Sequence, residues 1–286
     1  MKQIQLEQGT KEWLSWRKTV ITATDASIIM GNNPWTTPYK CWQNKLGLVE
    51  EQKTNDAMER GKKLEPEARA QFIQRYDLIM EPMVVESTEY EFLGASLDGI
   101  CLSGRFILEI KCGGAKLHDL AARGEIPAYY LDQMQHQLLV TRAEKCFYYS
   151  YDGKEGICIE VLPDPEFIIR FMPKAREFWR NVAFSEPPAM TNKDYKDMTG
   201  RLSWDSFALE YRKTCEQIKN LEDLKESYRK ELIKLCGEDS CCGSGIKVLK
   251  RIVKGKIDYD SIQVLKEIDL EKHRKPSSSS WMIMLE

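Results

Sequence analysis

The stretch LGASLDGICLSGRFILEIKC, residues 93–112, places two acidic residues inside two short runs that otherwise resemble buried strands. These runs, residues 95–101 and 105–111, flank Ser103-Gly104, a pair that favours a turn, so we expect a β-hairpin. Asp98 and Glu109 are unusual in such a setting, because a charged side chain in a half-buried strand costs free energy unless a partner offsets its charge.

The hairpin turn predicts how these charges are arranged. With Ser103-Gly104 at the tip, Asp98 lies opposite Glu109. Side chains alternate along a strand, so Asp98, Glu109 and Lys111 are expected on one face, and Leu97, Leu108 and Ile110 on the other face, within the core. Two opposed carboxylates destabilise a hairpin unless a cation lies between them.

A hard divalent cation resolves this conflict, since Mg²⁺ takes oxygen ligands and keeps several waters. Such a site suits phosphodiester hydrolysis, in which the metal polarises the phosphate and a lysine orients the attacking water or neutralises developing charge. The alternative is an exposed hairpin face with ordinary surface charges. The spacing D-x(10)-E-x-K does not by itself decide between the two, because chance supplies it often.

The surrounding sequence predicts an α/β fold, with a central mixed β-sheet flanked by helices (a restriction-endonuclease-like core) and a mainly helical C-terminal extension. The helical patterns precede and follow the strand-like runs. Helices are expected at residues 10–18, 21–31, 54–76 with a break near Gly61 or Pro66, 115–123, 127–141 and 164–184, and residues 32–47 are expected to form a turn followed by a short helix that ends at Gly47. Further strands are expected at residues 83–87, 90–93, 145–152 and 156–163.

A break in the pattern at SEPPAMTNKDYKDMTG, residues 185–200, divides the chain into a core of residues 1–184 and an extension of residues 185–286. The extension begins with apolar residues spaced by threes and fours, which indicate one long amphipathic helix. Its stripe is expected to pack against the core or a second subunit. A strand, a helix and a strand are expected after it, and the basic first strand either contacts nucleic acid or is a solvated edge.

Composition excludes several classes of protein. The formal net charge of −2 does not suit a protein that coats nucleic acid, although it is compatible with a nuclease. Nine scattered cysteines without a CxxC pair do not suit a disulfide scaffold or a zinc site, and adjacent Cys241 and Cys242 are poor joint ligands, so no iron–sulfur cluster is expected. With no apolar run of about 18 residues and no signal-peptide pattern, we expect no membrane contact and a cytoplasmic protein.

Several segments resemble a known family. "SLDGI…ILEIKC" is similar to the PD-(D/E)XK nuclease signature, with Leu97 in place of the proline. "WRKTVITATDASIIMG", "RGKKLEPEAR", "LEIKC" and "YYLDQMQHQLLVT" resemble motifs of the YqaJ-type viral recombinase family, to which phage lambda exonuclease is related, in the same order over residues 10–184.

The resemblance implies roles for the acidic residues and their neighbours. Asp98, Glu109 and the carbonyl of Ile110 would be metal ligands, and Glu65 would complete the metal site. Lys111 would position the attacking water. The implied cofactor is Mg²⁺, for which Mn²⁺ would substitute.

The resemblance also assigns residues outside the hairpin. Gln133 would bind the water or the lysine near the site. Arg17 would hold a terminal 5′-phosphate, a bidentate task that suits guanidinium, and Thr24 would donate to a phosphate from a helix start. Asp25 we interpret as the cap of that helix.

The implied function is a Mg²⁺-dependent exonuclease that degrades double-stranded DNA 5′→3′ to mononucleotides and leaves a 3′ single strand for phage-type recombination. The implied partner is a single-strand annealing protein, the assembly a ring-shaped homotrimer, and the location a bacterial cytoplasm, with a phage or prophage gene. The alternatives are an endonuclease or RecB-type nuclease of other polarity, and a DNA-binding or assembly protein that has lost catalysis. The extension lies outside the core of the shortest members.

Overall fold

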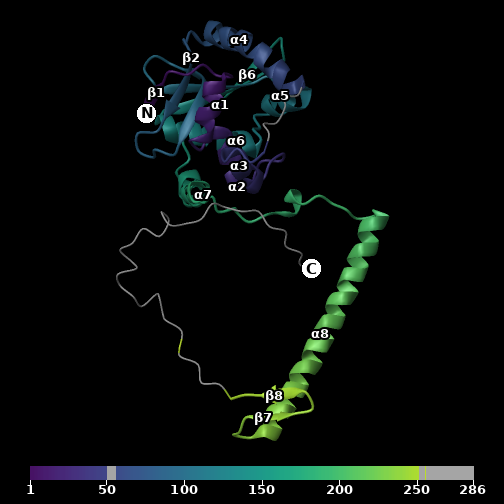
Figure 1. Ribbon diagram of the computed structural model, residues 1–286. Coiled ribbons are helices and arrows are strands. Elements are labelled where there is room, and N and C mark those ends of the chain that lie inside the picture. The colour runs from purple at the N-terminus through teal and green to yellow at the C-terminus, as the bar shows by residue number, and fades with distance from the viewer. Residues whose placement is uncertain (50–55, 251–254, 256–286) are drawn as a thin grey trace. The chain divides into compact units, whose positions relative to one another are not determined.

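The computed structural model describes residues 1–49, 56–250 and 255 (Figure 1). The chain divides into two compact units, Met1–Tyr195 and the part from Lys196 onward, and each is described by itself. The domain boundary that the sequence predicts after residue 184 falls directly after helix α7 (Pro165–Ala183), and the division at that residue stays a prediction.

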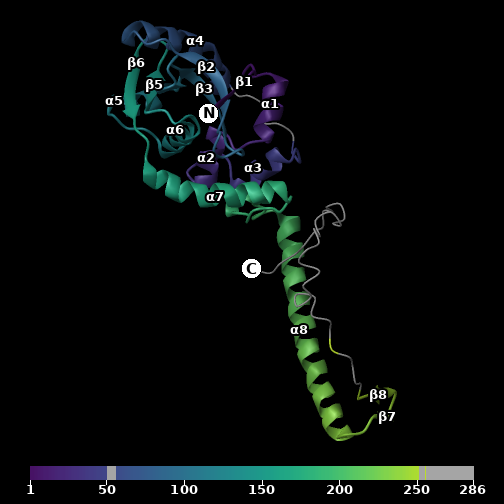
Figure 2. The ribbon, with the colours of Figure 1, turned by 90° about the vertical axis from the view of Figure 1, so that its left-hand side faces the viewer.

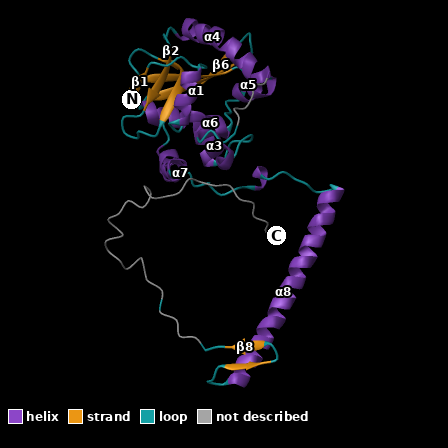
Figure 3. Ribbon diagram, in the orientation of Figure 1, coloured by secondary structure: helices purple, strands orange, loops and turns teal. Residues whose placement is uncertain are grey.

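The first unit is built on one sheet of six strands in the order β1 to β6 (Figure 3). Neighbouring strands are antiparallel except β4 and β5, which run parallel, so the predicted mixed sheet is confirmed. The strands are β1 (Lys2–Ile4), β2 (Glu81–Glu86), β3 (Gly94–Ile100), β4 (Phe106–Lys111), β5 (Lys145–Tyr151) and β6 (Gly156–Val161).

Helices cover both faces of this sheet, as Figures 1 and 2 show. The remaining helices of the unit are α1 (Lys11–Lys18), α2 (Ala23–Met30), α3 (Pro38–Lys45), α4 (Asp56–Tyr76), α5 (Ala115–Ala122) and α6 (Ala128–Thr141). On one face, Phe72 of α4 packs with Leu108 and Tyr149. On the other face, Met134 of α6 and Phe171 of α7 belong to the larger core cluster.

The parallel pair β4 and β5 explains why α6 lies beside the acidic hairpin. Parallel neighbours cannot be joined by a tight turn and need a crossover connection, which here contains α5 and α6. The crossover returns over the face that α2 also covers, and α6 packs against both α2 and β3. Side chains of α6 are thereby brought next to β4.

Three local features differ from the sequence-based expectation. Residues 90–92 form no strand, because the Ser87 hydroxyl accepts hydrogen bonds from the backbone N–H groups of Glu89 and Tyr90, and Leu93 forms only an isolated β-bridge with Ile21. Helix α4 continues through Pro66 without the expected break. The short strand β1 was not expected from its sequence, and it forms by pairing with β2.

The second unit contains α8 (Leu202–Cys236), which confirms the predicted long helix of the C-terminal extension. The hairpin of β7 (Cys241–Gly243) and β8 (Ile246–Val248) follows α8, whereas the 3₁₀ turn Asn192–Asp194 belongs to the end of the first unit. The strand expected at the start of the tail corresponds to β8. The helix and second strand expected after it lie outside the described residues.

Candidate active site

The hairpin of β3 and β4 has the register that its turn predicts, since Gly99 pairs with Leu108 and Ile100 with Ile107. The ladder ends at Gly99, however, so Asp98 and Glu109 are not a paired position. Instead, the Asp98 carboxylate accepts a hydrogen bond of 2.7 Å from the backbone N–H of Ile110. The Asp98 carboxylate thus accepts from a backbone N–H that would otherwise bond to a carbonyl oxygen of the neighbouring strand.

The expected sharing of one core face by Leu97 and Leu108 is wrong. Leu97 belongs to the cluster beneath α6 and α7, whereas Leu108 belongs to the cluster beneath α4. The cause is an irregularity in the pairing of β2 with β3, where Met83 lies opposite Leu97 but Glu81 lies opposite Ile100. This β-bulge changes the alternation of side chains at Asp98 and Gly99.

The Glu109 carboxylate is buried, with 1% of the residue exposed, and three donors hold it. Its Oε1 accepts from Lys111 Nζ and from Gln133 Nε2, and its Oε2 accepts from Gln137 Nε2 at 2.6 Å. Gln137 was not expected at the site. The available signal was its place one helical turn after Gln133, which puts both amides on one face of α6.

Helix α4 contributes a second acidic side chain with its own cation. Glu65 forms an ion pair with Arg69, and Arg69 also donates from Nε to the Asp98 carbonyl oxygen at 2.6 Å. Sequence reasoning identified Glu65 but not Arg69. The pair therefore connects α4 directly to the strand that carries Asp98.

The charged side chains of this cluster shift one another's pKa values. Removal from water, and then the charges of Glu109 and Glu65, hold the pKa of Asp98 well above its ordinary value. Burial also raises the pKa of Glu65. Burial alone would lower the pKa of Lys111, but the charges of Glu109 and Asp98 raise it overall, so the lysine stays protonated. Its Nζ also lies 4.7 Å from the centre of the Tyr130 ring.

The donor set is of the type that a hard divalent cation takes. Asp98, Glu109 and Glu65 supply carboxylate oxygens, and their mutual repulsion is what a bound cation would relieve. In the described part of the chain, no group of three or more His, Cys, Asp and Glu side chains is already arranged to hold a metal ion. Lys111 and Arg69 provide the positive charge near these carboxylates in the present arrangement.

Arg17 and Thr24 line a cavity of about 950 Å³ that also reaches Glu65 and Arg69. The cavity is bounded by α1, α2, α3, α4 and β2. The guanidinium of Arg17 lies over the Trp13 ring, 4.7 Å from its centre. Thr24 lies in the first turn of α2. The structure thus brings the two residues predicted to bind phosphate into one cavity with Glu65.

A buried ion pair fixes the wall of this cavity. Asp25 closes a capping box with Thr22 at the start of α2, which confirms its interpretation as a cap. Lys45 of α3 donates to Asp25 and to the carbonyl oxygens of Arg17 and Val20, at 2.6 Å each. Although burial opposes it, the positive charges of Lys45 and Arg17 lower the pKa of Asp25 to about 2. Lys45 was not expected from the sequence.

No helix among the described residues is both long enough and apolar enough to span a membrane.

The comparisons with known proteins find similarity to one family. Residues 12–144 match the model of the YqaJ-like viral recombinase domain. The chain is 30% identical over 191 residues to the uncharacterized protein YqaJ of Bacillus subtilis (strain 168), an alignment that covers 64% of this chain and 60% of YqaJ. It is also 30% identical over 159 residues to the uncharacterized protein R354 of Acanthamoeba polyphaga mimivirus, covering 50% of this chain and 28% of R354. The chain therefore spans less than two thirds of either relative.

Solved structures with a similar fold include LHK-Exo, an alkaline exonuclease from Laribacter hongkongensis. Its complex with dAMP has a TM-score of 0.55 and 25% identity to this chain, with 62% of this chain and 94% of LHK-Exo covered. A second structure of the same enzyme gives a TM-score of 0.54 at 24% identity, with the same coverage. The fold of this chain is thus similar to that of LHK-Exo.

Proposed function

Because residues 12–144 match the model of the YqaJ-like viral recombinase domain, we propose that this protein is a Mg²⁺-dependent exonuclease that degrades double-stranded DNA 5′→3′. Its products would be mononucleotides and a 3′ single strand for phage-type recombination. The observation that carries the proposal is the convergence of Asp98, Glu109 and Glu65 with Lys111, beside a cavity that contains Arg17. The complex of LHK-Exo with dAMP, a deoxynucleoside monophosphate, supports the same class of product.

The metal would be held by Asp98, Glu109 and the Ile110 carbonyl oxygen, with Glu65 completing the site. Mn²⁺ would substitute for Mg²⁺, because both accept oxygen ligands. When bound, the ion supplies polarisation of the scissile phosphate and a lower pKa for a bound water.

The other residues around Glu109 orient the reaction. Lys111 keeps its proton, so it acts as a cation and hydrogen-bond donor toward the attacking water or the developing charge. Gln133 and Gln137 donate to Glu109 and hold its carboxylate in one orientation. This fixed orientation is the contribution of α6, since a carboxylate held by two amides loses little freedom when it binds a cation.

The cavity of α1 and α2 would receive the terminal 5′-phosphate. The Arg17 guanidinium can form two parallel hydrogen bonds to a phosphate. Thr24 lies in the first turn of α2, where backbone N–H groups and the helix dipole favour an anion. Lys45 supports this wall through the carbonyl oxygen of Arg17 and the carboxylate of Asp25.

The family resemblance also suggests the partners that we propose for this protein. The enzyme would act with a single-strand annealing protein, as a homo-oligomer whose nuclease units form a ring-shaped trimer, in the cytoplasm of a bacterium that carries the phage or prophage gene.

Digestion of linear duplex DNA, labelled in parallel at the 5′ or the 3′ ends, tests the proposal. With Mg²⁺, the wild-type protein should release the 5′ label first as a mononucleotide, and EDTA should stop this release. A closed circular duplex is the matched control and should remain intact. Cleavage of the circle would favour an endonuclease, early release of the 3′ label would favour the opposite polarity, and binding without cleavage would favour a DNA-binding protein.

A further inference from the structure

Helix α8 exposes an apolar surface along its whole length. The helix has 35 residues, and none of them is buried. Trp204, Phe207, Leu221 and Leu235 expose 54%, 77%, 65% and 83% of their surfaces. Contiguous apolar surface of this extent marks an interaction site.

The spacing of these residues identifies the kind of partner. They recur at alternating intervals of three and four residues, a period of 3.5, which belongs to coiled coils, whereas a helix lying on a globular core follows a period of 3.6. The first positions of the five heptads are Trp204, Tyr211, Ile218, Lys225 and Leu232, and the fourth positions are Phe207, Thr214, Leu221, Tyr228 and Leu235. Eight of these ten residues, the heptad stripe, are apolar or aromatic. The partner is therefore another helix with the same repeat.

We propose that α8 pairs with α8 of a second copy of this chain as an antiparallel two-stranded coiled coil. The two polar residues of the stripe determine the register. When Lys225 of one copy lies opposite Thr214 of the other, the full helices overlap. A parallel pair in register would instead place Lys225 against Lys225, and a polar residue at such a position selects among the alternatives.

In this register each remaining residue of the heptad stripe lies opposite an apolar or aromatic residue. Each of these contacts occurs twice, because a twofold axis relates the two copies, as a contact between identical surfaces requires. Ile218 lies opposite Leu221, and Tyr211 opposite Tyr228. The two large aromatic residues near the start of the helix lie opposite leucines near its end, Phe207 opposite Leu232 and Trp204 opposite Leu235.

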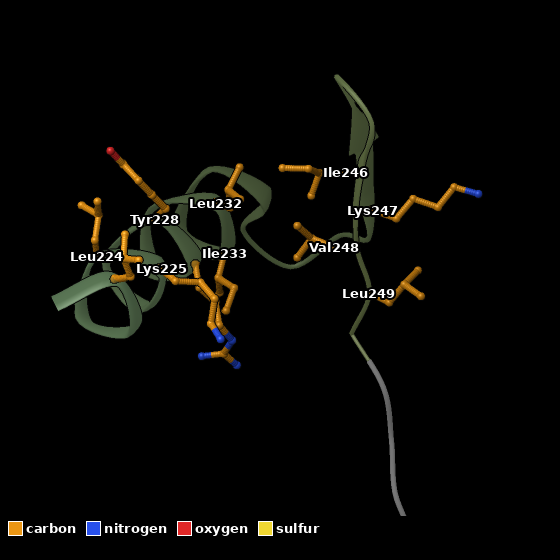
Figure 4. Close-up of a pocket in the computed structure, with 11 residues that line it drawn as sticks. Leu224, Lys225, Tyr228, Leu232, Ile233, Ile246, Lys247, Val248 and Leu249 are labelled. Atoms are coloured by element: carbon orange, nitrogen blue, oxygen red, sulfur yellow. The ribbon is translucent and has the colours of Figure 1, made fainter. Parts of the chain in front are cut away.

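Near the end of α8, the heptad stripe faces strand β8 of the same chain. A cavity of about 630 Å³ opens between α8 and β8, lined by Tyr228 and Leu232 on the helix and by Ile246 and Val248 on the strand (Figure 4). Figure 4 shows Ile246 and Val248 directed toward the helix. Phe207 of the second copy, opposite Leu232, would meet this apolar wall.

The area is sufficient for a stable dimer. An aromatic side chain buries about 150–250 Å² when it is enclosed. Four aromatic residues on each of two helices, with the four aliphatic residues of each stripe, reach the order of the 1,200–2,000 Å² that a standard interface buries. The pairing does not depend on nuclease activity or on how the nuclease units assemble.

Light scattering on the whole 286-residue chain tests the pairing. Leu221→Asp places a charge in the centre of the stripe and should halve the molar mass of the wild-type assembly. Leu209→Asp is the matched control, because Leu209 is 47% exposed on the opposite side of the helix, and it should keep the wild-type mass. The proposal is overturned if Leu221→Asp keeps that mass too, since another segment or another protein would then cover the stripe. A monomeric wild type would overturn it equally.

A second variant tests the direction of the helices. In Thr214→Glu, the introduced carboxylate would face Lys225 twice in the antiparallel pair, so the assembly should persist to lower protein concentration than wild type. In a parallel pair, the introduced carboxylate would face its counterpart in the other copy, and the assembly would dissociate at higher concentration. That second outcome would contradict the antiparallel register.

Discussion

Glu109 is the residue around which the candidate site is organised. It is buried in a sheet, and a buried carboxylate persists as an anion only where donors or cations compensate its charge. Lys111 compensates the charge, while Gln133 and Gln137 fix the two oxygens. Each donor is therefore expected to contribute to both stability and activity.

Gln137→Ala should destabilise the protein by about 1–3 kcal/mol, because Oε2 of Glu109 loses its buried donor. The variant should also lower kcat, since the carboxylate gains freedom. Urea unfolding and DNA digestion measure the two effects. Gln135→Ala, whose side chain donates to the Leu162 carbonyl oxygen away from the site, should leave kcat unchanged. Equal kcat values for the Gln137 variant and wild type would contradict this role.

Arg17→Ala should remove the preference for 5′-phosphorylated ends. Hydrogen bonds to a charged group contribute about 1.5–3 kcal/mol, so kcat/KM on a 5′-phosphorylated duplex should fall about 10- to 150-fold. On a 5′-hydroxyl duplex it should change little. Arg176→Ala, an exposed arginine on α7, serves as the control and should keep the wild-type preference. A wild-type enzyme with equal rates on both ends would refute the phosphate pocket.

His136 should make stability depend on pH. Burial lowers its pKa to about 4, from an ordinary value of 6.5. Between these values the unfolded chain binds a proton that the folded chain excludes, so the contribution of His136 to stability should fall by about 3 kcal/mol as pH decreases from 6.5 to 4. His136→Gln should flatten the unfolding free energy over this range. Asp25, with its pKa of about 2, affects stability at lower pH. If the unfolding free energy of His136→Gln changes with pH as steeply as that of wild type, the histidine is excluded as the cause.

At the scale of residues, the sequence was sufficient where the chemistry depends on local spacing. The strand pattern predicted that Asp98, Glu109 and Lys111 share one face, whereas their assignment to a metal site required the family resemblance. Arg69 and Lys45 could not be predicted, because each acts on the backbone of a distant element, Arg69 on Asp98 and Lys45 on Arg17. Their positions depend on packing between helices.

At the scale of elements, the β3–β4 hairpin shows where local prediction stops. Its turn residues fix the pairing of Gly99 with Leu108. The bulge opposite β2 depends on a third strand, and it moves Leu97 to the other face from Leu108. The same bulge lies where the ladder ends, next to Asp98, whose carboxylate there accepts from the backbone N–H of Ile110.

Gly99→Ala tests the importance of this close packing. A Cβ atom at Gly99 would lie 2.8 Å from Met80 Cβ and 3.1 Å from Leu108 Cβ. Such overpacking costs about 1–3 kcal/mol, so urea unfolding should show a loss of that size. Gly61→Ala is the matched control, since nothing lies within 4 Å of its Cβ position and alanine favours a helix. A Gly99 variant as stable as wild type would show that the strands adjust freely.

At the scale of the whole molecule, the order of helical and strand patterns predicted the sheet and its covering helices. It did not predict which helices meet at the site, because that depends on the parallel β4–β5 pair and its crossover. The crossover brings Gln133 and Gln137 to one side of the acidic cluster, while α4 brings Glu65 to it from the other helical layer. The site is thus a property of the complete first unit.

The proposed function requires that this acidic cluster be the active site of a metal-dependent nuclease. Digestion of 5′-phosphorylated linear duplex with Mg²⁺, by wild type, Lys111→Ala and Lys174→Ala, tests it most directly. Lys174 is an exposed lysine on α7. Wild type and Lys174→Ala should release nucleotides at equal rates, and Lys111→Ala should be slower by a factor of about 100 or more, the order expected when one stabilising group of a transition state is removed. Equal rates for all three proteins would contradict the account.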